Sequence, residues 1–245
     1  MEKTYDTAKP AKDIHHSHGS AVNLIIDMSS LNKGLSTRGK RLFIARHGET
    51  VFNLAGRIQG NEAHTPLTQR GFAQANEMGR ALASYLENST NNLALVASDT
   101  GRALQTLSVV CEHINMDWHQ VSADPRLREI NMGEWEGIYY HALDGQLQID
   151  REQSLFLTPA PGGESYGDIA GRLKTWIAEQ SFERDMLLIS HGMTSRVLRG
   201  LLTGRMPLEL IGAPIAESLP QGSMVQIVDG VETTVHLGTG DGEQA

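Results

Sequence analysis

The sequence has a single cysteine, Cys111, among its 245 residues. No disulfide can therefore form within one chain, and a reducing, cytoplasmic compartment is favoured. No apolar run approaches the roughly 18 residues that a membrane-spanning helix needs, so we expect neither such a helix nor a membrane partner. The first residues lack the apolar segment of a secretory signal, and none is expected.

Basic residues are fewer than acidic ones, and the formal net charge is −8. A nucleic-acid-binding protein would present a basic face, so nucleic acid is not an expected partner. Hydrophobic residues make up 40% of the sequence and charged residues 20%, which is typical of a soluble globular protein. The length suits one α/β domain.

The two ends of the chain are polar. Residues 1–20 show no periodicity, and we expect a disordered arm there. His15, His16 and His18 in this arm could bind a metal ion, but a solvated tail is the simpler interpretation. We therefore assign residues 1–39 to an N-terminal extension, residues 40–237 to the domain and residues 238–245 to a polar tail.

Short apolar strands alternate with amphipathic helices along the domain. Strands are expected at residues 42–45, 93–97 and 186–189, and an edge hairpin at residues 224–228 and 231–237. Helices are expected after Thr68, after a cap at Ser98 or Asp99, after the capping-box pair Ser165 and Asp168, and through residues 197–202. This alternation predicts an α/β fold in three layers, with a mostly parallel central sheet and helices on both faces.

Three of these strands end on residues that carry chemistry. The first ends at Arg46-His47-Gly48, the second at Ser98 with Arg102 four residues on, and the third at Ser190-His191-Gly192. Ligands of open α/β sheets bind beyond the carboxyl ends of the strands, so these side chains should converge. Arg102 falls in the first turn of a helix, where the helix dipole disfavours a cation unless an anion binds beside it.

A phosphoryl group is the anion that best fits two arginines and two histidines. The arginine fork matches phosphate oxygens and keeps its charge, and a histidine can attack phosphorus to give a covalent phosphohistidine. No carboxylate or histidine cluster has metal-ligand spacing, so we expect neither a metal nor a cofactor. Glu129, Glu134 and Glu136 could each supply the acid for the leaving oxygen, and their spacing does not choose among them.

These residues lie within a longer series of motifs in a fixed order. The series runs Arg46-His47-Gly48-Glu49-Thr50, Asn53, Ile58-Gln59-Gly60, Thr65-Pro66-Leu67-Thr68 with Gly71, Ser98 to Thr106 around Arg102, Leu127-Arg128-Glu129-Ile130 with Gly133 and Glu136-Gly137, Pro161-Gly162-Gly163-Glu164-Ser165, and Ser190-His191-Gly192. The series resembles the histidine phosphatase superfamily, the phosphoglycerate mutase-like proteins, over about residues 40–235. The resemblance implies that family's α/β fold and a phosphoryl-transfer chemistry.

The resemblance also implies a role for each matching residue. His47 would be the nucleophile, and Glu129 would be the general acid and then the base, which resolves the choice among the three carboxylates. The phosphoryl group would be bound by Arg46, Asn53, Arg102 and His191, and the substrate would lie near Gln59, Gly60 and Gly192. One position departs from the family pattern, because His64 stands where the family commonly has an acidic residue.

We expect a phosphomonoester hydrolase that takes a small phosphorylated substrate and works as a monomer or homodimer. Mutases of this family carry basic residues in an insertion after the catalytic acid, whereas residues 130–160 contain Arg151 as their only Arg or Lys. Mutase-type phosphoryl transfer is therefore one alternative, and a non-catalytic phosphate or phosphopeptide binder is another. A binder would be expected to have lost His47, Glu129 or His191, and all three are present. The pocket walls are expected from residues 60–66 and 137–160, which carry no readable specificity code.

Overall fold

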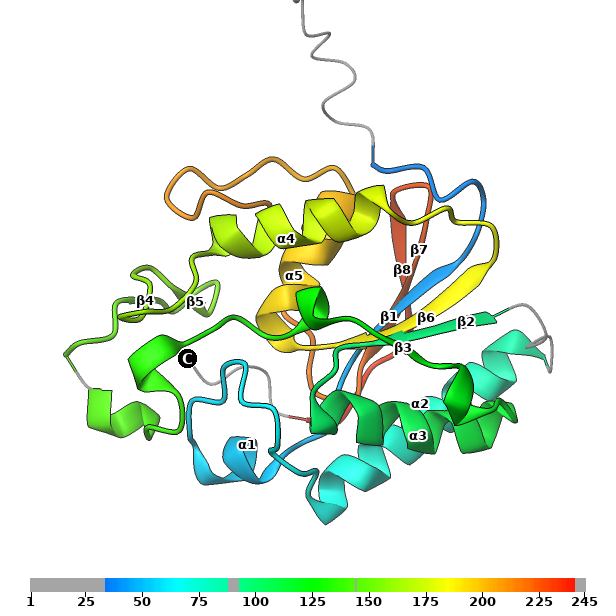
Figure 1. Ribbon diagram of the computed structural model, residues 1–245, viewed down its shortest axis with the longest axis horizontal. Coiled ribbons are helices and arrows are strands. Elements are labelled where there is room, and N and C mark those ends of the chain that lie inside the picture. The colour runs from blue at the N-terminus through cyan, green and yellow to red at the C-terminus, as the bar shows by residue number, and fades with distance from the viewer. Residues whose placement is uncertain (1–33, 88–92, 144, 241–245) are drawn as a thin grey trace, which may run out of the picture.

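A six-stranded sheet forms the centre of the protein in the computed structural model, which describes residues 34–87, 93–143 and 145–240 (Figure 1). The strand order is β3-β2-β6-β1-β7-β8. The strands are β1 (Leu42–Arg46), β2 (Leu93–Ala97), β3 (Ser122–Ala123), β6 (Asp185–Ser190), β7 (Met224–Val228) and β8 (Val231–His236). The first four in the order run parallel, and β7 is antiparallel to both of its neighbours. A separate small hairpin pairs β4 (Ile149–Asp150) with β5 (Leu155–Phe156).

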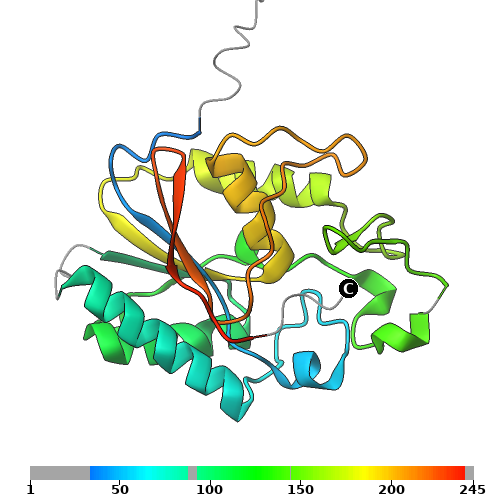
Figure 2. The same cartoon turned by 180° about the vertical axis from the view of Figure 1, so that it is seen from behind.

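Helices cover both faces of this sheet. α2 (Gln69–Leu86) and α3 (Gly101–Ile114) pack on one face, and α4 (Tyr166–Ala178) and α5 (Gly192–Leu202) on the other (Figure 2). Successive residues of a strand point to opposite faces of the sheet. Phe43 and Ala45 of β1 therefore pack in the hydrophobic core beneath α2 and α3, and Leu42 and Ile44 pack in the core beneath α4 and α5. The predicted three-layer α/β fold with a mostly parallel sheet is confirmed. None of the described helices combines the length and the apolar character that crossing a membrane requires.

Short elements connect these layers. They are α1 (Val51–Ala55) and four 3₁₀ turns, η1 (Trp118–Gln120), η2 (Pro125–Leu127), η3 (Gly133–Trp135) and η4 (Tyr140–Leu143). Two predicted helix starts are confirmed, because Thr68 accepts a hydrogen bond from the Gly71 N–H and Ser165 forms a capping box with Asp168. Both caps satisfy N–H groups that the first helical turn leaves without partners.

The predicted cap of α3 at Ser98 or Asp99 is wrong, because the N-cap is Thr100. The Ser98 N–H still donates to the Ile189 carbonyl, so the chain follows the sheet for one residue beyond β2. The Asp99 carboxylate is taken by the Arg128 guanidinium, with two contacts of 2.6 Å. Ser98 and Asp99 are both good capping residues by type. The sequence did not indicate that Arg128, 29 residues further on, binds the Asp99 carboxylate.

Described residues on both sides of the predicted domain contact it. The Leu35 N–H donates to the Leu202 carbonyl, and Asp229 at the β7–β8 turn accepts from the Thr37 and Gly39 N–H groups. At the other end, the Gly238 N–H donates to Ser223 Oγ. The disorder expected for residues 1–20 lies outside the described residues.

Candidate active site

Two histidines meet at the carboxyl ends of neighbouring parallel strands. Arg46 at the end of β1 is in register with Ser190 at the end of β6, so His47 and His191 leave the sheet side by side. Their ring centroids are 5.1 Å apart, and both side chains are buried. The convergence expected from the strand ends is therefore present in the structure.

His47 is held as the neutral tautomer whose Nε2 has a lone pair. Its Nδ1 lies 2.7 Å from the Gly48 carbonyl oxygen, and a carbonyl can only accept, so Nδ1 carries the proton. Burial lowers the pKa of His47 well below its usual 6.5, and the charges of Arg102 and Arg46 lower it further. A neutral ring with an unprotonated Nε2 is the form that can attack phosphorus.

Arg102 is wholly buried at the start of α3 and contacts His191. Its Nε–H donates to Nδ1 of His191 at 3.1 Å, and its Nη2 donates to the Gly60 carbonyl at 2.8 Å. Its Nη1 donates to Thr65 Oγ1 at 3.1 Å and to the Glu62 carbonyl. Burial lowers the pKa of Arg102 to about 10, so the group stays charged at neutral pH, and Glu129 and Glu62 oppose the shift.

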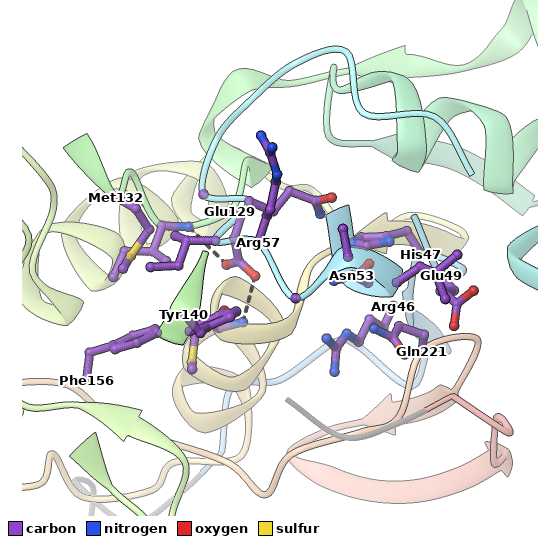
Figure 3. Close-up of a pocket in the computed structure, with 18 of the residues that line it drawn as sticks. Arg46, His47, Glu49, Asn53, Arg57, Glu129, Met132, Tyr140, Phe156 and Gln221 are labelled. Atoms are coloured by element: carbon purple, nitrogen blue, oxygen red, sulfur yellow. Dashed lines mark hydrogen bonds between the residues drawn. The ribbon is translucent and has the colours of Figure 1, made fainter. Parts of the chain in front are cut away.

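The Glu129 carboxylate is bound by the N-terminus of α5. Its two oxygens accept from the Met193 and Thr194 N–H groups, both at 3.0 Å, and from the Ile130 N–H at 2.9 Å (Figure 3). The N–H groups of Met193 and Thr194 lie in the first turn of α5 and lack partners within the helix, so they are available to hold the carboxyl group at this position. The Glu129 carboxyl group thus receives a fixed position from a helix that begins directly after His191.

The cavity distinguishes the three carboxylates that sequence spacing left equivalent. Glu129 lines it, whereas Glu134 is exposed and Glu136 accepts from the Asn61 and Met132 N–H groups at 3.0 and 3.1 Å. Glu136 therefore joins two loops, and Glu129 is placed to meet a ligand. The role that the family resemblance implied for Glu129 stays a prediction.

A salt bridge between Arg172 and Glu164 supports the loop that carries Glu129. Arg172 of α4 pairs with Glu164 at 2.9 Å, and its guanidinium also donates to the carbonyls of Arg126 and Glu129. Glu164 in turn accepts from the Asn131 N–H at 2.9 Å. Glu164 of the Pro-Gly-Gly-Glu-Ser motif therefore helps to position the segment on both sides of Glu129 through Arg172 and the Asn131 N–H. Glu164 itself does not line the cavity.

A cavity of about 380 Å³ opens in front of His47. Several residues of the expected site line it, namely Arg46, His47, Asn53, Gln59, Gly60 and Glu129. Arg102, His191 and Gly192 are buried and do not line it. Tyr140 and Phe156 also line it and fall within the wall expected from residues 137–160. Lining residues that the sequence expectations did not include are Glu49, Leu54, Ala55, Gly56, Arg57, Ile58, Arg70, Ile130, Met132, Met193 and Gln221.

Some of these lining residues lie in sequence motifs, and others lie in segments that carry no pattern. Glu49 belongs to the first motif, and its carboxylate accepts from Thr68 Oγ1 at 2.6 Å and contacts Arg70 at 3.4 Å. Gln221, Tyr140 and Phe156 lie in irregular segments or very short elements, where no periodicity marks a cavity wall. Within the expected wall of residues 60–66, Gly60 alone lines the cavity.

The polar neighbours of His47 are fixed by local backbone structure. Asn53 forms a capping box with Thr50 that uses its Oδ1, so its Nδ2 amide is the group that it can offer to a phosphoryl oxygen. Gln59 Oε1 accepts from Thr50 Oγ1 at 2.5 Å. A side chain at Gly48 would place Cβ 2.3 Å from the Gly71 carbonyl oxygen, which explains the glycine beside His47.

His64 is exposed and does not line the cavity, so its departure from the family pattern leaves the described site intact. Its neighbour Thr65 supplies the contact to Arg102. Within the described ranges, no group of three His, Cys, Asp or Glu side chains is placed to hold a metal ion.

The chain is similar in sequence and in structure to several known proteins. The chain is 33% identical to the Probable phosphoglycerate mutase GpmB of Proteus mirabilis over 171 residues, which cover 67% of this chain and 75% of that protein. It is 32% identical over 173 residues to the protein of the same name from Yersinia enterocolitica, covering 68% and 76%. The structure of a mycobacterial glucosyl-3-phosphoglycerate phosphatase with VO3 matches with a TM-score of 0.62 and 26% identity, covering 82% of this chain and 100% of that one. The family model of the histidine phosphatase superfamily (branch 1) matches residues 42–224, and the chain belongs to this superfamily.

Proposed function

We propose that the protein hydrolyses a small phosphomonoester through a covalent phosphohistidine at His47. The tautomer of His47 carries this proposal, because the Nδ1–H···O=C contact to Gly48 leaves Nε2 as the nucleophilic atom. Two buried arginines, Arg46 and Arg102, supply positive charge beside it. Charge of this kind, fixed before the reaction, stabilises the equatorial oxygens of a transferring phosphoryl group.

The reaction has two steps that balance around Glu129. In the first, a bond forms between His47 Nε2 and phosphorus while the ester P–O bond breaks, and protonated Glu129 gives its proton to the leaving oxygen. In the second, Glu129 takes a proton from water as the water oxygen attacks phosphorus. The N–P bond then breaks, and inorganic phosphate and neutral His47 result.

The position of basic residues favours hydrolysis over mutase-type transfer. A mutase must hold a substrate carboxylate beyond the catalytic acid. Arg151, the only Arg or Lys of residues 130–160, is exposed and does not line the cavity. The lining cations are Arg46, Arg57 and Arg70, and the Arg57 guanidinium stacks on Tyr139 at 4.3 Å and donates to the Tyr139 hydroxyl at 3.0 Å.

A quench experiment tests the proposal. The purified protein is mixed with a panel of phosphomonoesters, phosphate release is measured, and the denatured protein is assayed for acid-labile, base-stable phosphate. We expect phosphate release and labelling of His47, both lost in His47→Ala. Activity of His47→Ala near that of the wild type would refute the mechanism. Flux between 2- and 3-phosphoglycerate above phosphate release, on the same preparation with the bisphosphorylated primer, would establish the mutase instead.

A further inference from the structure

The cavity has two chemically different halves. One half contains the charged and amide side chains around His47, among them Arg46, Glu49, Asn53 and Gln221. Apolar side chains also line the cavity, and we call five of them, Ile130, Met132, Tyr140, Phe156 and Met193, the apolar wall. Figure 3 shows His47 and Glu49 on one side and Met132, Tyr140 and Phe156 on the other, with the Glu129 carboxylate between them in this view.

The position of Glu129 orients a substrate across the two halves. The phosphoryl group must reach His47, and the leaving oxygen must reach Glu129. The carbon skeleton bonded to that oxygen then continues beyond Glu129, on the side of the apolar wall. The part of the substrate that hydrolysis releases is therefore the part that meets these side chains.

The Tyr166 hydroxyl connects two members of the apolar wall, Phe156 and Met193. The Phe156 N–H donates to the Tyr166 hydroxyl at 3.1 Å, and that hydroxyl contacts Met193 Sδ at 3.5 Å. The rings of Tyr140 and Phe156 are nearly parallel, with an interplanar angle of 2° and centroids 6.5 Å apart. A surface ordered in this way loses little entropy when a ligand covers it, which favours binding.

The charge pattern excludes an acidic leaving group from this half. The apolar wall has no charged side chain, and Arg57 is occupied by Tyr139 and by the Gly137 carbonyl. In Figure 3 the Arg57 side chain is directed away from the Glu129 carboxylate. A carboxylate placed here would lose water without gaining a partner, which is costly.

We propose, building on the hydrolase function above, that the apolar wall selects phosphomonoesters whose alcohol is uncharged and apolar, with an aromatic ring as the best fit. The alcohol packs against Tyr140 and Phe156 while the phosphoryl group lies at His47. A cavity of about 380 Å³ is of the size that holds a small organic ligand. Aromatic side chains give such a ligand both buried area and favourable ring geometry.

Three alkyl esters of similar leaving-group strength test this selection. They are 2-phenylethyl phosphate, propyl phosphate and 2-carboxyethyl phosphate. We expect kcat/KM for the phenylethyl ester to exceed that for the propyl ester by about tenfold or more, since apolar contacts of this size discriminate by that factor. The carboxyethyl ester should be the poorest substrate of the three.

Variants of the apolar wall then assign the preference to its residues. Tyr140→Ala and Phe156→Leu should each reduce the phenylethyl-to-propyl ratio, by about fivefold for Tyr140→Ala, because the phenyl ring loses more contact area than the propyl chain. Tyr140→Phe keeps the ring and should keep the ratio. Tyr85→Ala, an exposed tyrosine on α2 outside the cavity, is the matched control. An unchanged ratio in both Tyr140→Ala and Phe156→Leu would overturn the proposal.

Binding of inert phosphonates separates this proposal from the hydrolase function. Calorimetry compares 3-phenylpropylphosphonate with propylphosphonate, neither of which can be hydrolysed. Equal dissociation constants, together with equal kcat/KM for the three esters, would overturn the selection and leave the hydrolase function standing. Tighter binding of the phenyl compound that Tyr140→Ala abolishes would support the selection even if no ester were hydrolysed, and the hydrolase function alone would then fail.

Discussion

The Nε–H of Arg102 donates to Nδ1 of His191 at 3.1 Å, and this single contact fixes the protonation of the second histidine. An arginine Nε–H can only donate, so Nδ1 of His191 has no proton and the neutral ring carries its hydrogen on Nε2. That Nε2 lies 3.4 Å from Thr100 Oγ1. The two histidines are therefore opposite tautomers, with a lone pair on Nε2 of His47 and a hydrogen on Nε2 of His191.

Replacing Arg102 with lysine tests the guanidinium directly. Lysine keeps the charge but cannot contact Gly60, Thr65 and His191 at once, because its ammonium is a single point. We expect Arg102→Lys to lower kcat/KM by about 10²-fold, the cost of misplacing site groups by about an ångström once their shared donor is lost, and to lower the melting temperature. Arg41→Lys is the matched control, since Arg41 pairs with Asp185 at the opposite end of β6. Equal activity of the two variants would show that charge alone suffices.

The two buried histidines predict a loss of stability in mild acid. Burial is the main cause that lowers the pKa of both His47 and His191 below 6.5, and neighbouring positive charges add to it. The unfolded chain therefore binds more protons than the folded chain below about pH 6.5. The free energy of unfolding should fall as the pH decreases from 6.5, with a slope of up to about 1.4 kcal/mol per pH unit for each histidine.

Denaturant unfolding between pH 5.5 and 7.5 measures this slope. His191→Asn and His47→Asn each remove one of the two proton sites, so each variant should show a shallower slope than the wild type. A slope that is unchanged in both variants would mean that other groups cause the acid sensitivity.

Removal of metal ions should leave the activity intact. The proposed chemistry uses Arg46 and Arg102 for the charge that a metal ion would otherwise supply. We expect the same kcat after dialysis against EDTA as before it, and inhibition by vanadate and inorganic phosphate at the His47 site. Loss of activity in EDTA with recovery in Mg²⁺ would refute the arginine-based mechanism.

The sequence predicted the inner part of the site because that part follows from strand ends. Parallel strands place their carboxyl ends at one edge, so Arg46, His47 and His191 could be brought together from periodicity alone. The choice of Glu129 needed the family resemblance, because most of the hydrogen bonds to its carboxyl group come from backbone N–H groups, those of residues 130, 193 and 194. Backbone donors leave no mark on the residue types of a sequence.

Residues 137–160 were expected to supply part of the outer wall, and Tyr140 and Phe156 do line the cavity, but the sequence could not single these two residues out. Tyr140 lies in a 3₁₀ turn and Phe156 in a two-residue strand. Elements this short have no periodicity that tells a core residue from a wall residue. Their orientation is set by contacts such as that of Tyr166 with the Phe156 N–H, which joins two elements ten residues apart.

Arg172 should act on the reaction through the position of Glu129. Its guanidinium connects α4 to the carbonyls of residues 126 and 129, and Glu164 orients it. We expect Arg172→Ala to reduce kcat by about tenfold or more with a small change in KM, because a displaced acid affects the transition state more than binding. The loss should be larger with an alkyl phosphate than with p-nitrophenyl phosphate, whose leaving group hardly needs an acid. Equal losses on both substrates would indicate a purely structural role.

Glu129→Gln separates the two chemical roles of the carboxylate. Glutamine cannot donate a proton as an acid, and its amide NH₂ would face the N–H groups of Ile130, Met193 or Thr194. We expect phosphorylation of His47 by an alkyl phosphate to slow by about 10²- to 10⁴-fold, the range typical of a lost general acid. With p-nitrophenyl phosphate the first step should slow much less, whereas hydrolysis of the phosphohistidine still needs a base.

Rapid mixing of Glu129→Gln with p-nitrophenyl phosphate should therefore give a burst of about one equivalent of p-nitrophenol, since one histidine is phosphorylated per site. Slow turnover should follow as phosphohistidine accumulates, and the alkyl ester should give no burst. Glu134→Gln, which changes an exposed carboxylate of the same segment, should behave as the wild type. If the p-nitrophenol burst slows as much as alkyl ester cleavage, Glu129 is not the acid. If phosphohistidine does not accumulate, Glu129 is not the base that activates water.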